Sequence, residues 1–191
     1  IVGARSGYPQ GFVNLNFESP IPPLTPDSSF TVPISNALPG WKGYLGADET
    51  DRVAFNGVSL GAPAISLHSQ ASSFPPIQGN YSVILQPSTG GLTTASLSQS
   101  GQIPPAARSL LFFGAVFMQV SFAGLPLSLV QVGSEPNYQI VGADISSFAG
   151  QTGELKFVMV RPFSFPTMSY LDNIQFSDQA IPEPSAVSLF A

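Results

Sequence analysis

The sequence predicts an all-β protein, a β-sandwich of jelly-roll type with about ten short antiparallel strands. The chain holds 19 Pro and 18 Gly in 191 residues, which is unfavourable for long helices. Short apolar stretches recur between Gly and Pro turns, at intervals of roughly 8–15 residues. Some of them, MQVSF and ELKFVMV above all, alternate apolar and polar residues as half-buried antiparallel strands do.

The first part of the chain predicts two strands joined by a loop. Residues 12–19, FVNLNFES, alternate apolar and polar and predict the first strand. Four prolines in residues 20–29 require an extended loop. Residues 30–35, FTVPIS, predict an edge strand, because Pro33 cannot donate a hydrogen bond to a ladder. A sharp turn, LPGWKGYLG, follows.

The rest of the chain predicts a succession of strands. They are RVAFNGVSL (52–60), AISLHS (64–69), YSVILQ (81–86), TASLSQS (94–100), RSLLFFGAVFMQVSFAG (108–124), LSLVQV (127–132), NYQIVGADIS (137–146), ELKFVMVRPF (154–163) and YLDNIQFS (170–177). The one helical candidate is a turn around DISSFAGQ, capped by Asp144 or Ser146. We expect one sandwich domain, residues 12–178, with the first and last strands side by side. A flexible segment, 1–11, precedes it, and a tail, 179–191, follows it.

The composition excludes several classes of partner and site. The formal charge is −5, and the few Lys and Arg residues are scattered, so no basic surface is expected for nucleic acid. Only 9% of residues are charged, against roughly 25% in typical soluble proteins. This charge-poor, polar composition is common in secreted β-proteins. The chain has no cysteine, which rules out disulfides and thiolate zinc sites.

The C-terminal residues IPEPSAVSLFA resemble the start of the PEP-CTERM sorting signal. In that family a Pro-Glu-Pro motif precedes a hydrophobic helix and a short basic cluster, and Pro182, Glu183 and Pro184 match the motif. AVSLFA would be the first turns of the helix, and we expect its remainder to have been trimmed or to lie beyond Ala191. The two prolines favour an extended, accessible segment. The alternative is an ordinary proline-rich tail.

This resemblance implies where the protein acts. It implies a Gram-negative bacterium, export to the cell surface or extracellular matrix, and recognition by an exosortase. Membrane contact would be transient, through the missing C-terminal helix. Proteins with this signal are usually associated with secreted polysaccharide.

The body of the chain is similar to the galactose-binding-like jelly rolls of carbohydrate-binding modules. The similar pieces are NLNFES, LPGW, GADISSFAGQTGELKFVMV and YLDNIQFS, short and scattered over residues 14–177. The group includes plant cell-wall domains with an N-x-x-FE…PGW opening. The resemblance implies neighbouring first and last strands and a non-catalytic role in binding polysaccharide.

Glu18 and Asp172 form the candidate metal site. Several jelly rolls of this kind carry a structural calcium ion that ties the first strand to the last. Ca²⁺ takes about 6–8 oxygen ligands, which acidic side chains and backbone carbonyls on adjacent strand ends can supply. The alternative is that Glu18 and Asp172 accept hydrogen bonds from backbone amides where strands cross.

Sugar binding requires flat aromatic faces for the C–H surfaces of the rings and polar groups for the hydroxyls. The amphipathic aromatic and polar side chains make the candidates Trp41, Tyr44, His68, Tyr81 and Arg161, with Tyr138 as a further aromatic. Trp41 could equally pack in the core beneath the Pro-Gly-Trp turn. The 15 phenylalanines are expected in the core.

The sequence favours a non-enzymatic function. It has one histidine and no phosphate-binding loop. We expect a secreted, matrix-associated protein that binds exopolysaccharide. One alternative is a structural protein that self-associates through sheet edges, with SLLFFGAVFMQVSF as an aggregation-prone stretch if it is uncovered. The other is a glycan hydrolase.

Overall fold

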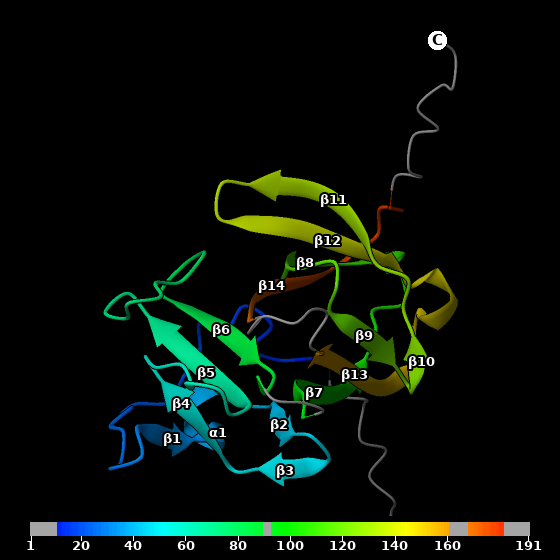
Figure 1. Ribbon diagram of the computed structural model, residues 1–191. Coiled ribbons are helices and arrows are strands. Elements are labelled where there is room, and N and C mark those ends of the chain that lie inside the picture. Colours follow the sequence, from blue (N-terminus) through cyan, green and yellow to red (C-terminus); the bar gives the residue numbers. More distant parts are fainter. Residues whose placement is uncertain (1–10, 90–92, 161–167, 182–191) are drawn as a thin grey trace, which may run out of the picture.

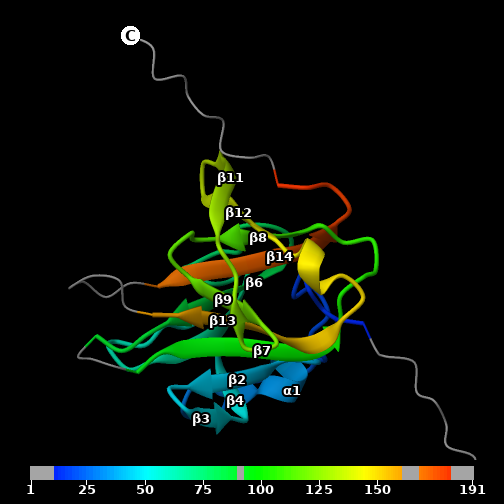
Figure 2. The same ribbon diagram turned by 90° about the vertical axis from the view of Figure 1, so that its right-hand side faces the viewer.

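Two antiparallel-rich sheets form the protein, so the predicted all-β sandwich is confirmed (Figures 1 and 2). The computed structural model describes residues 11–89, 93–160 and 168–181. Pro182, Glu183, Pro184 and Arg161 therefore lie outside the described residues. The strands of the described residues, β1 to β14, outnumber the ten expected. The predicted stretch 108–124 divides into two strands, and short strands also form at residues 42–45, 48–50 and 125–126, where none was predicted.

The first sheet has eight strands. In spatial order they are β1 (Thr31–Pro33), β4 (Arg52–Phe55), β5 (Ala64–Ser69), β6 (Tyr81–Gln86), β14 (Ser169–Ser177), β8 (Ser109–Gly114), β12 (Tyr138–Asp144) and β11 (Val130–Glu135). All neighbours are antiparallel except β4 and β5. β1 is an edge strand that contains Pro33, as predicted.

The second sheet has six strands and lies across the first (Figure 2). In order they are β10 (Leu125–Pro126), β9 (Gln119–Phe122), β13 (Thr152–Met159), β7 (Ala95–Gln102), β2 (Lys42–Leu45) and β3 (Asp48–Thr50). The short helix α1 (Ile34–Ala37) follows β1, and a 3₁₀ turn, η1 (Ser146–Phe148), forms at the predicted helical candidate. Among the described residues, no helix is long and apolar enough to cross a bilayer.

The apolar faces of the two sheets meet in the core. Phe112 of β8 contacts Phe157 of β13 edge to face, with ring centroids 5.2 Å apart. Along β9 and β13, buried and accessible residues alternate as the sequence predicts. The aggregation-prone stretch divides into β8 and β9, which belong to different sheets and have a paired strand on both sides. Neither is an edge strand.

The first predicted strand is wrong. Within residues 12–19, Asn14 (φ 50°) and Phe17 (φ 55°) adopt left-handed backbone conformations, which break an extended strand. The prediction that this first segment lies beside the last strand is nevertheless correct. The backbone N–H of Ile174 in β14 donates to the carbonyl of Leu15 (2.9 Å).

Candidate functional site

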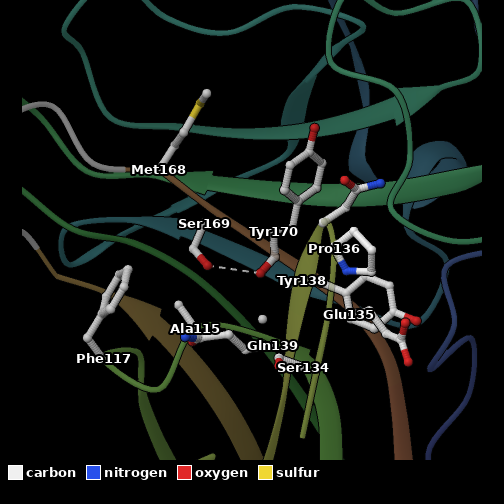
Figure 3. A pocket seen from close by; sticks show the side chains of 12 residues that line it. Ala115, Phe117, Ser134, Glu135, Pro136, Tyr138, Gln139, Met168, Ser169 and Tyr170 are labelled. Atoms are coloured by element: carbon white, nitrogen blue, oxygen red, sulfur yellow. Dashed lines mark hydrogen bonds between the residues drawn. The ribbon is translucent and has the colours of Figure 1, made fainter.

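A groove lies at one end of the eight-stranded sheet, with a volume of about 390 Å³ (Figure 3). Three segments that are distant in the sequence form it: the end of β8 with the loop after it, the turn of the β11–β12 hairpin, and the start of β14. The lining residues are Gly114, Ala115, Phe117, Ser134, Glu135, Pro136, Asn137, Tyr138, Gln139, Met168, Ser169 and Tyr170.

Tyr138 provides a supported aromatic surface in the groove. Its ring stacks on Phe113 of the neighbouring strand β8, with centroids 4.2 Å apart and planes inclined by 24°. The register explains this contact: Phe113 is opposite Ile140, so Tyr138 is its diagonal neighbour on the same face. Since Phe113 covers one face and Tyr138 is only half-buried, the ring is held in place yet accessible.

The opposite wall of the groove is largely apolar. Phe117 and Met168 are 39% and 38% exposed, which is high for such side chains. Between the two walls, Tyr170 is held by its hydroxyl, which donates to the carbonyl of Pro75 (3.1 Å). Burial raises the pKa of the Tyr170 phenol above its usual value of 10.0, so this side chain is neutral at physiological pH.

Polar groups lie between these apolar walls. The Gln139 amide accepts from the backbone N–H of Val116 (3.4 Å) and donates to Gln131 (3.0 Å), which fixes its orientation. The hydroxyl of Ser169 donates to the carbonyl of Tyr170 (3.0 Å; Figure 3). The groove thus combines an accessible aromatic face, apolar walls and amide or hydroxyl groups, the combination that a sugar ring requires.

Among the residues that the structure describes, the ligand candidates predicted from the sequence do not gather around this groove. Trp41 is 4% exposed and lies in the core, which is the alternative that the sequence left open. Tyr44 belongs to the other sheet, where Lys156 Nζ lies 4.6 Å from the centre of its ring. Tyr81 is half-buried on β6 and packs against the core. Of the aromatic residues considered, only Tyr138 lines the groove.

His68 is fully buried on β5. Its Nδ1 lies 2.7 Å from the Ser72 hydroxyl, and its Nε2 has no hydrogen-bond partner among the described residues. Burial lowers the pKa of His68 to about 4, so the ring is neutral at physiological pH. This position gives His68 no access to a ligand in solution.

Asp172 is close to His68 in the sheet. The cross-strand partner of His68 is Ser82, whose hydroxyl donates to Oδ2 of Asp172 (2.6 Å). The Asp172 Oδ1 accepts from the backbone N–H of Asn173 (2.6 Å). The pKa of Asp172 is raised to about 7, first by burial and to a smaller extent by the negative charge of Glu18, against the lowering effect of these hydrogen bonds.

Glu18, the other candidate calcium ligand, is bound to the loop before β6. Its Oε1 accepts from the backbone N–H groups of Asn80 (2.8 Å) and Tyr81 (2.9 Å), and its Oε2 accepts from the Asn80 side chain (3.0 Å). These contacts are those of the hydrogen-bonding alternative. The described parts of the chain hold no group of three or more His, Cys, Asp or Glu suited to a metal ion.

Comparison of the chain with protein-family models found no match, and comparison with curated proteins found none either.

Proposed function

We propose that this protein is a non-catalytic β-sandwich that binds carbohydrate in the groove beside Tyr138. The stacked pair of Tyr138 and Phe113 carries the proposal, because a ring that is fixed from behind loses little conformational freedom when a sugar packs on its front. The polar groups of the groove would bind the hydroxyls. Polysaccharide of an extracellular matrix is the ligand that we propose.

Binding of soluble oligosaccharides, measured by calorimetry, tests this proposal. We expect Tyr138→Ala to weaken binding by about tenfold or more, and Tyr138→Phe to retain most of it, because the aromatic face remains. Tyr44→Ala is the matched control, since Tyr44 is a half-buried tyrosine on the other sheet. The proposal is wrong if no glycan binds, or if the Tyr44 and Tyr138 variants weaken binding equally.

We also propose export to the surface or matrix of a Gram-negative cell through an exosortase. The Pro182-Glu183-Pro184 motif supports this proposal, and so does the exposure of residues 178–180 just before it. A full-length gene that encodes an apolar helix and arginines after Ala191 would agree with it. A longer reading frame that continues with a further folded domain would contradict it.

Calcium remains a proposal for Glu18 and Asp172. The proximity that lets Glu18 raise the pKa of Asp172 supports it, since a cation between two carboxylates would relieve their repulsion. We expect Ca²⁺ to raise the melting temperature relative to EDTA at about pH 8. The increase should be smaller near pH 6, where Asp172 is protonated, and absent in Asp172→Asn. An equal increase in that variant, or none in the wild type, would contradict the proposal.

A further inference from the structure

The groove carries negative charge and no positive charge among its described lining residues. Of the twelve described residues that line it, only Glu135 has a charged side chain. Glu135 is exposed, at the last position of β11, close to Tyr138 in the groove wall (Figure 3). The ion pairs found among the described residues join Lys42 to Glu49 and Arg52 to Asp27, so neither neutralises Glu135.

The net charge of the whole chain has the same sign as the charge of Glu135. The formal net charge is −5, so the field of the protein adds to that of Glu135. A uronic-acid polysaccharide carries a carboxylate on its sugar units and would be repelled from such a groove. A sugar with a free amine carries an ammonium group and would be attracted, while a neutral sugar would be affected little.

The position of Glu135 places this charge where a stacked sugar would bind. Glu135 and Tyr138 are cross-strand partners, the last pair before the hairpin turn. The backbones of such partners are about 5 Å apart, so the carboxylate can reach a substituent on a sugar that covers the Tyr138 ring.

We propose that the groove selects glycans with free amines, such as partly deacetylated amino-sugar polymers, and discriminates against uronic-acid polymers. This selectivity rests on the proposed function, since it concerns the same groove and the same aromatic surface. Glu135 is the residue that determines it.

Three tetrasaccharides test the proposal by calorimetry at about pH 6: glucosamine, N-acetylglucosamine and galacturonic acid oligomers. We expect the glucosamine oligomer to bind about fivefold more tightly than the N-acetylated one, and the galacturonic acid oligomer to bind most weakly. Added salt should reduce these differences.

Two variants isolate the charge. Glu135→Gln should abolish the difference in affinity between the amine and acetylated oligomers. Glu154→Gln, at an exposed glutamate on β13 of the other sheet, should keep the preference. Equal binding of the amine and acetylated oligomers by the wild type, tighter binding of the uronate, or loss of preference in both variants would overturn the selectivity alone. If none of the three oligomers binds, the proposed function fails together with it.

Discussion

Asp172 is a carboxyl group in a buried position, with 1% of its surface exposed. The local structure of β14 explains why it is there. Asp172 is opposite Phe113 and Gln175 is opposite Leu111, so the strand bulges between them, and Asn173 takes a left-handed conformation (φ 47°). The bulge frees the N–H of Ile174 for Leu15. The buried acid is thus part of the junction between the two ends of the described chain.

The raised pKa of Asp172 predicts that its contribution to stability is lost as pH rises from about 4 to about 7. Between the ordinary pKa of 3.8 and the folded value of about 7, the folded state holds a proton that the unfolded chain releases. The contribution of Asp172 to the free energy of unfolding therefore falls as pH rises through this interval. We expect Asp172→Asn to raise that free energy at about pH 8 by roughly 1–3 kcal/mol, measured by urea denaturation.

His68 changes the free energy of unfolding with pH in the opposite direction to Asp172, and the same urea denaturation experiment measures it. Its folded pKa, about 4, lies below the ordinary 6.5, so acidification through this interval favours the unfolded chain. With the Asp172 effect removed, stability of Asp172→Asn should rise from about pH 4 to 6.5 and then level off. Asp178→Asn, at an exposed carboxylate, is the control. A decline between pH 6.5 and 8 that is the same in both variants would contradict the assignment to Asp172.

At the scale of elements, the sequence predicted paired strands better than it predicted the segment at the start of the chain. AISLHS and YSVILQ correspond residue for residue to β5 and β6, because turn residues flank each of them. Residues 12–19 alternate equally well, but alternation does not reveal what binds the backbone. Here a side chain replaces a neighbouring strand: the Gln99 amide accepts from the N–H of Val13 (2.6 Å) and donates to its carbonyl (3.0 Å).

This side-chain clamp predicts a local effect of mutating Gln99. Gln99→Leu removes both hydrogen bonds to Val13, and we expect a loss of about 1–2 kcal/mol in the free energy of unfolding. Amide hydrogen exchange should increase most at residues 12–18. Gln102→Leu is the control on the same strand, because Gln102 makes one bond, to the carbonyl of Gly150 (2.9 Å), and should leave that exchange unchanged. Equal exchange in both variants would show that Gln99 does not hold the segment.

The groove could not be predicted from the sequence, for a related reason. Tyr138 was identified from its residue type alone, but Phe117 and Tyr170 come from other segments, and no local pattern indicates that they converge. For Trp41 the sequence left two positions open, the binding surface and the core. An aromatic residue in a Pro-Gly-Trp turn suits either a binding surface or the core, and only the packing of both sheets decides between them.

At the scale of the whole molecule, Trp41 lies where the first described segment, residues 12–18, packs on the two sheets. Its ring is near Phe17 (centroids 5.6 Å apart) and Phe157 of β13 (6.3 Å), and its Nε1 donates to the carbonyl of Asn14 (3.1 Å). Phe17 itself is fully buried. Since residues of the first segment contribute to the common core, the segment and the sheets should unfold together.

The single tryptophan makes this cooperativity measurable. Tryptophan fluorescence reports the junction and far-UV circular dichroism reports the sheets, and we expect one denaturation midpoint from both. Phe17→Leu should lower both midpoints together, by about 1 kcal/mol in the free energy of unfolding, because a buried ring is replaced by a smaller side chain. Phe30→Leu, at a phenylalanine that is 73% exposed, should change neither midpoint appreciably. A change in fluorescence before the change in circular dichroism would contradict this prediction. It would show that residues 12–18 detach while the sandwich is still folded, and that they are not part of its cooperative core.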